Sequence, residues 1–159
     1  MVKVSGINFR REFRAACEQN TCGKYQKCWM CPPDVGDIDE MIARAKTYEN
    51  ALVFQMVEPL EDSFDIEGMQ AAAKKHTALT AALAEAVRPR LPGALTLGAG
   101  ACHICEVCAR LENKPCLHPE KAIASLEAYG IAVSELAEYC GMNYINGPNT
   151  VTFFGGFLF

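Results

Sequence analysis

The apolar positions of the chain follow two different periods. Between residues 66 and 87, an alanine-rich segment carries Leu79 and Leu83 at helical spacing, which predicts a long helix that ends before Pro89. Residues 51–57 are instead almost continuously apolar, as in a strand that is buried on both faces. The chain therefore contains both helix and strand signals, with the strand preceding the long helix.

A second apolar run at residues 94–97 follows that helix. Strand 51–57, helix 66–87 and strand 94–97 together predict a right-handed parallel βαβ crossover, so the fold class is α/β with a small sheet. Residues 7–16 predict a short helix, and residues 151–159 predict a strand, a bulged strand or a hairpin around two glycines.

Three shorter helices are predicted from their end signals. Residues 37–49 have an apolar stripe and begin at Asp37, a suitable N-cap. Residues 119–129 begin with a proline and stop before a glycine, and residues 134–140 begin at Ser134. The segments 17–33 and 98–119 carry no helical pattern and are expected to be cysteine-rich loops.

Composition and charge narrow the class of protein. The 159 residues are 50% hydrophobic and 21% charged, which suits one domain spanning residues 1–159. The net charge is -4 and no dense lysine and arginine block occurs, so a nucleic-acid partner is not expected. The first residues lack the apolar run of a signal peptide, and no segment reaches membrane-spanning length. We therefore expect a cytoplasmic protein without a membrane partner.

Nine cysteines are many for this length. An odd number and the missing export signal argue against a secreted disulfide scaffold, and clustered intracellular cysteines indicate metal binding. We interpret the ninth, Cys140, as a small structural hydrophobe. The other eight fall into two groups, which predict two metal centres: Cys17, Cys22, Cys28 and Cys31, and Cys102, Cys105, Cys108 and Cys116.

The second group has the spacing of an iron–sulfur site. Cys102, Cys105 and Cys108 repeat at every third residue, as in the ferredoxin run that binds a [4Fe-4S] cluster. Cys116 follows after seven residues as the candidate fourth ligand. The alternative is structural zinc, which also takes four thiolates but usually from two C-x2-C pairs.

The first group has no familiar spacing. Its cysteines predict a second [4Fe-4S] cluster, and Cys31 precedes a proline as in ferredoxins. The alternative is two separate thiols and a redox-active C-x2-C pair. Because the distant cysteine of two-cluster ferredoxins binds the other cluster, Cys31 and Cys116 could also be exchanged between the sites.

Three residues beside the cysteines are candidates for cofactor contact. Gly98 and Gly100 lead directly into the triplet, where small residues allow the backbone to pass close to a bulky group. Trp29 flanks the first group and is expected to shield a cluster from water, although core packing would explain it equally well.

Several motifs occur in order along nearly the whole chain: Lys-Cys-Trp-Met-Cys-Pro-Pro at residues 27–33, the cysteine triplet, Lys-Pro-Cys at residues 114–116, and Ser-x3-Tyr-Gly-Ile at residues 125–131. In these the chain resembles an uncharacterised bacterial and archaeal family of predicted metal-binding proteins, domain of unknown function 2284. The resemblance implies metal binding and iron–sulfur chemistry, and supplies no substrate. Such proteins usually read Gly-Lys-Ser-Trp before Cys-Pro-Pro, so Cys28 is a departure of this chain.

These observations predict an iron–sulfur protein with two [4Fe-4S] clusters that transfers electrons to or from a partner redox enzyme in an anaerobic or microaerobic cell. Two alternatives remain open. One is an enzyme whose cluster has an open iron that binds substrate as a Lewis acid, and the other is an interaction module stabilised by zinc.

Overall fold

The computed structural model describes all residues, 1–159. Its centre is a five-stranded mixed sheet with the strand order β1-β2-β5-β3-β4. The strands are β1 (Val2–Lys3), β2 (Asn50–Pro59), β3 (Leu95–Gly98), β4 (Ala124–Ser125) and β5 (Thr150–Leu158). The helices are α1 (Glu12–Glu18), α2 (Ile38–Ala45), α3 (Ile66–Val87) and α4 (Val133–Tyr139), with the 3-10 turns η1 (Val4–Gly6), η2 (Ala109–Glu112) and η3 (Glu127–Tyr129).

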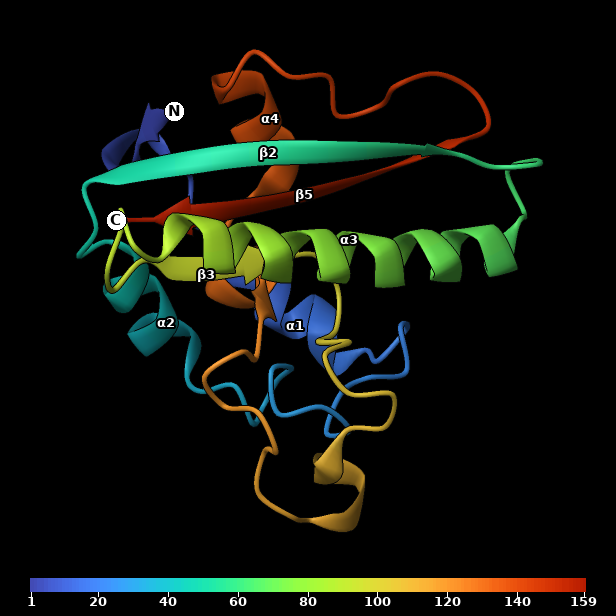
Figure 1. The fold of residues 1–159 in the computed structure, drawn as a ribbon, viewed down its shortest axis with the longest axis horizontal. Helices are drawn as coiled ribbons and strands as arrows, with labels where there is room; N and C mark the ends of the chain where they lie inside the picture. The colour runs from blue at the N-terminus through green and yellow to red at the C-terminus, as the bar shows by residue number, and fades with distance from the viewer.

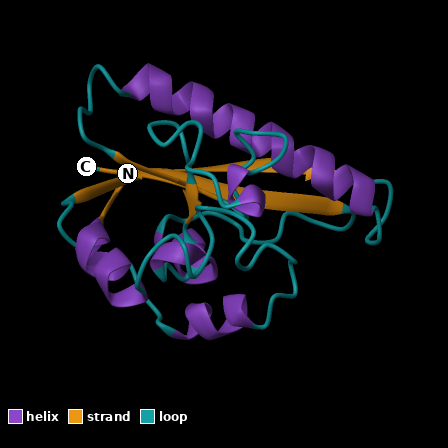
Figure 2. Cartoon of the chain, turned by 90° about the horizontal axis from the view of Figure 1, so that it is seen from below, coloured by secondary structure: helices purple, strands orange, loops and turns teal.

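The molecule has three layers. The long helix α3 lies along one face of the sheet, and α1, α2 and α4 lie on the opposite side (Figures 1 and 2). Fully buried side chains of β3, β5 and α4, among them Leu97, Phe157 and Leu136, fill the space between the layers. Burial of such large apolar side chains is the main source of the scaffold's stability.

The predicted α/β class is confirmed, and the sheet adds one strand to the predicted crossover. β2 and β3 both pair antiparallel with β5, so they run parallel to each other but are not neighbours. The directly paired parallel strands are β3 and β4. Strand β2 is also not buried on both faces, because Leu52 and Val57 are 37% and 38% exposed. These two residues lie on opposite faces of the strand, so each face is covered along only part of its length.

The predicted helix 66–87 is confirmed in full, and α2 is capped as expected by the Asp37 side chain, which accepts from the backbone N–H groups of Asp39 and Glu40. Three details were wrong. The short helix predicted at residues 7–16 is α1, Glu12–Glu18, because Phe9 forms an antiparallel bridge with Ile131 and the helix extends through Cys17. Helix α4 begins after Ala132 without a side-chain cap, so Ser134 does not cap it. The segment 119–129 is not a helix, because Ala124 and Ser125 pair with β3 as strand β4 and only η3 follows.

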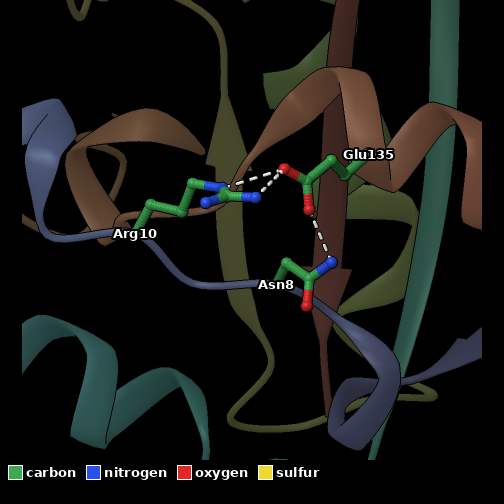
Figure 3. A network of polar contacts seen from close by, with 3 residues as sticks. All are labelled: Asn8, Arg10 and Glu135. Atoms are coloured by element: carbon green, nitrogen blue, oxygen red, sulfur yellow. Dashed lines mark hydrogen bonds and ion pairs between the residues drawn. The ribbon is translucent and has the colours of Figure 1, made fainter.

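The chain before α1 is fixed to the segment around α4. Arg10 and Asn8 both donate to the Glu135 carboxylate, with Arg10 Nε at 2.8 Å (Figure 3). The Arg10 N–H also donates to the Gly130 carbonyl at 2.6 Å. Gly130 has φ +74°, and a Cβ there would lie 3.1 Å from the Arg10 carbonyl oxygen, so glycine permits this approach. The network holds α1 beside η3.

The two cysteine-rich loops gather at the lower end of the molecule in Figure 1, below the sheet. One leaves α1 and returns at α2, and the other connects β3 to β4. No helix has the length and apolar character that crossing a membrane requires.

Candidate metal centre

The second cysteine loop connects the two strands of the parallel pair, β3 and β4. Strand β3 ends at Gly98, and the chain then passes through the triplet before it returns to the sheet as β4. The Leu126 N–H donates to the Gly98 carbonyl at 2.9 Å, so both ends of the loop are tied together. A parallel pair needs a long connection, and here the cysteines occupy it.

Five thiols line one pocket. They belong to Cys28, Cys102, Cys105, Cys108 and Cys116, so the triplet and Cys116 meet as predicted and Cys28 joins them from the other loop. Most of the remaining lining is apolar, including Trp29, Ile104 and Leu117. Free space in this pocket is about 20 Å³. We call it the C-terminal thiol pocket.

Trp29 and Arg110 hold the two loops together at this pocket. The Trp29 indole N–H donates to the Lys114 carbonyl at 2.9 Å. Arg110 forms a largely buried ion pair with Asp34, Nε to Oδ2 2.8 Å, and its guanidinium lies 5.3 Å from the Trp29 ring centroid. These contacts join residues more than 70 positions apart in sequence and place Cys28 beside the triplet.

The thiols of the C-terminal pocket influence one another. Burial, and then the charges of Cys116, Cys108 and Cys28, raise the pKa of Cys105. Burial raises the pKa of Cys102, although hydrogen bonds from backbone N–H groups act in the opposite direction and lower it. A hydrogen bond from Cys31, assisted by backbone N–H groups and Cys108, outweighs burial and lowers the pKa of Cys28 to about 6. A bound cation would relieve the repulsion between these thiolates and displace their protons.

The other three cysteines line a second pocket. Cys17 comes from the last turn of α1, and Cys22 and Cys31 come from the loop that follows. This N-terminal thiol pocket has about 220 Å³ of free space and a polar wall that includes Tyr25, Ser125 and Glu127. Met30 lines both thiol pockets, so they are adjacent.

Cys28 lies at the boundary between them. Its thiol interacts with Cys31 of the N-terminal pocket and with Cys108 of the C-terminal pocket. As the donor to Cys28, Cys31 keeps its proton, and this hydrogen bond with burial raises the pKa of Cys31. The sequence placed Cys28 in the first group, whereas its side chain lines the pocket of the second.

A buried guanidinium adjoins the N-terminal pocket. Arg14 donates from Nη1 to the Gly36 carbonyl at 2.7 Å, but its Nε and Nη2 are buried without a hydrogen-bond partner. Its charge acts on Cys17, lowering the pKa of that thiol against the larger, opposite effect of burial. Unpartnered donors on a buried cation favour an anionic group nearby, such as a thiolate-ligated cluster.

Glu127 is the polar residue that the sequence analysis missed. Burial raises the pKa of its carboxyl group, opposed by hydrogen bonds from its own backbone and from Ser125. The Ser125 hydroxyl also accepts from the Ala128 N–H at 3.0 Å, which fixes the turn that carries Glu127. Because the residue lies in a segment that resembles a helix, no sequence signal identifies it.

The three residues predicted to contact a cofactor lie in different places. Gly100, with φ +66°, lines the N-terminal pocket. Gly98 lies within β3, where a Cβ would be 3.1 Å from the Ile123 side chain, so it serves strand packing. Trp29 lines the C-terminal pocket, and Cys140 packs against the hydrophobic core away from both.

The donor chemistry fits an iron–sulfur cofactor. Eight thiols share two adjoining pockets, and thiolates are the usual ligands of such clusters. No group of three or more histidine, cysteine, aspartate or glutamate side chains is arranged to hold a metal ion. The candidate ligands therefore line pockets whose side chains would have to rearrange on metal binding, and the C-terminal pocket, with about 20 Å³, would have to widen to hold a cluster.

Comparison with known proteins supports metal binding in general. No match was found among curated proteins or among solved structures. The family model described as "Predicted metal-binding protein (DUF2284)" matches residues 1–159. The chain therefore belongs to the DUF2284 family of predicted metal-binding proteins.

Proposed function

We propose that the protein is an iron–sulfur protein that carries two [4Fe-4S] clusters, one in each thiol pocket, and exchanges electrons with a partner redox protein. Clusters of this type accept and release single electrons, and hydrogen bonds, charge and exposure to solvent set their potentials. In this proposal Cys102, Cys105, Cys108 and Cys116 hold the first cluster. Cys17, Cys22 and Cys31 hold the second.

The observation that carries the proposal is the position of Cys28. It lines the C-terminal pocket with Cys108, its carbonyl accepts from the Cys31 N–H at 2.9 Å, and Met30 lines both pockets, so ligands of the two centres are close neighbours. Two redox centres this close can share electrons within one small domain. Because the two centres are close, electrons can pass from one to the other within the protein.

The surroundings of the first centre suit a redox role. Trp29 and Ile104 line the pocket with apolar surface, which lowers the local dielectric. The Trp29–Lys114 hydrogen bond and the Arg110–Asp34 ion pair keep that wall in place. A fixed wall limits the reorganisation that accompanies a change of charge.

The partner we propose is an acidic redox protein. Val107, Leu111 and Leu117 are exposed on the second cysteine loop. Lys24 and Lys27 line a neighbouring hollow that also exposes Cys102 and Cys105. Lysines next to apolar side chains form a surface that an acidic partner can approach with electrostatic guidance.

A second candidate function rests on the N-terminal pocket. Three thiols beside about 220 Å³ of free space favour a centre with one non-thiolate position, as the open-iron enzyme requires. In that case the first cluster supplies electrons to a reaction at the second. Cys28 would then lie on the path between them.

Anaerobic purification and cluster reconstitution test the proposal. We expect about eight irons and eight sulfides per chain, a brown protein, and a zinc content well below one per chain. After reduction, the electron paramagnetic resonance spectrum should show two interacting spins, because the centres are adjacent. Stoichiometric zinc without sulfide would contradict the iron–sulfur assignment, and two independent spectra would contradict the close pairing.

A further inference from the structure

The N-terminal pocket contains a fourth donor besides its three thiols. Glu127 lines the same pocket as Cys17, Cys22 and Cys31. Its carboxylate also acts electrostatically on the Cys17 thiol. The four side chains come from α1, the following loop and η3, so the fold brings them together from distant parts of the sequence.

The Glu127 carboxylate has no cationic partner. The seven ion pairs of the structure do not include it, and neither Lys24 nor Arg14 lies within ion-pair distance. The cost of ionising this partly buried carboxyl group falls when it binds a metal cation, and the pocket that it shares with three thiols places metal-ligating groups beside it.

The position of Cys28 leaves room for this carboxylate. Cys28 lines the C-terminal pocket with the triplet and Cys116, and it is absent from the lining of the N-terminal pocket. A tetranuclear cluster needs one ligand for each iron. Three thiols therefore leave one iron of the second centre without a cysteine, and Glu127 is the donor that faces the same space.

A second cavity begins on the far side of Glu127. It has about 220 Å³ of free space, shares Glu127 and Gly100 with the N-terminal pocket, and has an aromatic wall of Tyr144 and Phe154, whose rings stack on each other. A small planar molecule can lie against such a wall while a donor atom points toward Glu127. Entry from this side would bring it to the carboxylate before the thiols.

We propose that Glu127 is the fourth protein ligand of the metal centre held by Cys17, Cys22 and Cys31, and that a small molecule with a nitrogen or oxygen donor displaces it from the aromatic cavity. The cluster form of this inference rests on the proposed function. An oxygen ligand binds cluster iron less firmly than a thiolate does, because soft thiolates are the preferred donors. Exchange therefore occurs at Glu127 while the three thiolates keep the centre in place.

The test compares wild-type protein with Glu127→Cys, Glu127→Ala and Glu127→Gln after anaerobic reconstitution, with imidazole as the probe. We expect imidazole to change the spectrum of the second centre in the wild type. Glu127→Ala should lose about one iron unless imidazole is present during reconstitution to replace the missing ligand. Glu127→Cys should keep about eight irons and no longer respond, since a fourth thiolate resists displacement. Glu127→Gln should lose about one iron, leaving a three-iron centre.

Glu18→Gln is the matched control, since Glu18 also acts on Cys17 but is exposed and outside the pocket. It should leave the spectrum and the imidazole response unchanged. Eight irons with identical spectra in all Glu127 variants would overturn this inference alone. If Cys28→Ser loses one iron and leaves a three-iron centre, but the Glu127 variants do not, Cys28 is the fourth ligand.

Cobalt binding to the metal-free protein separates this inference from the cluster assignment. The Co²⁺ absorption spectrum depends on the number of thiolates and oxygens bound. We expect three thiolates and one oxygen at the N-terminal site in the wild type, and four thiolates in Glu127→Cys. If wild-type protein holds no sulfide but shows this cobalt change, the proposed function fails and Glu127 remains a ligand. If the cobalt spectra are the same, Glu127 is not one.

Discussion

The two thiol pockets lie side by side but differ in nearly every property. The C-terminal pocket has five thiols, an apolar lining and about 20 Å³ of free space, which is room for roughly one water molecule. The N-terminal pocket has three thiols, a polar wall with Glu127 and about 220 Å³. A small, thiol-rich pocket suits a centre that only changes its charge, whereas a larger pocket with an oxygen donor suits one that exchanges a ligand.

Their origins in the fold explain the difference. The C-terminal pocket is built mainly from one loop, whose two ends are fixed by the parallel pair β3 and β4. The N-terminal pocket is assembled from α1, its loop and η3, and the contacts of Arg10 with Gly130 and Glu135 help to hold these separate elements together. A site assembled from separate elements can open further than one closed within a single loop.

Loss of one triplet thiol should have the largest effect, and it should remove the cluster of one pocket while leaving that of the other. Cys105→Ser should remove about four of eight irons, because each thiolate of the triplet serves a different iron. The spectrum of the N-terminal centre should persist without the spin interaction. Iron and sulfide analysis with electron paramagnetic resonance measures both results. Cys140→Ser is the control and should keep all eight irons, and an unchanged spectrum in Cys105→Ser would remove the basis of the assignment.

Local sequence signals predicted the parts of the fold that depend on local physics. The limits of α3 follow from an alanine-rich helical pattern that ends before Pro89, and the Asp37 cap of α2 follows from its side-chain chemistry. The convergence of the triplet with Cys116 follows from their spacing along one loop. In each case the information lies within about 20 residues.

Features that depend on distant pairing could not be predicted. The insertion of β5 between β2 and β3 requires a strand that is far from both in sequence. Pairing of Ala124 with β3 overrides the helix signals of Pro119 and Gly130. For the same reason Glu127 had no visible role and Cys28 was grouped with its sequence neighbours, because both positions depend on how the loops meet.

The buried histidine of the scaffold tests whether acid affects the pockets through their thiols or through the fold. His76 is 1% exposed, stacks with Phe54 and Phe153, and has no partner for Nε2. Burial lowers its pKa from 6.5 to about 4. Between these values the unfolded chain binds the proton and the folded protein does not, so folding stability falls as the pH drops from 6.5 to about 4.

The loss over that range amounts to about 3 kcal/mol, at 1.36 kcal/mol for each pH unit. We expect His76→Leu, which has a similar volume, to remove this part of the pH dependence and to leave the difference between the pockets intact. Chemical unfolding of metal-free protein between pH 4 and 7 measures the effect. His118→Gln is the control because His118 is exposed. An unchanged slope in His76→Leu would show that other groups cause the acid sensitivity.

The smallest expected effect concerns the network that holds α1 beside η3. Arg10→Ala removes the contacts with the Glu135 side chain but leaves the backbone hydrogen bond to Gly130. Because the ion pair is about half exposed, solvent screens it and overall stability should hardly change. The distance between Cys17 and Glu127 should nevertheless become less fixed. We expect metal affinity at the N-terminal pocket to fall by about two- to fivefold, without change at the C-terminal pocket.

Lys3→Ala, which breaks another exposed ion pair on β1, is the matched control and should affect neither site. Competition with a chelator, followed by the spectrum of each centre, measures the two affinities separately. Equal weakening of both pockets would mean that they respond as one rigid unit, and the contrast between the larger and the smaller pocket would then be lost.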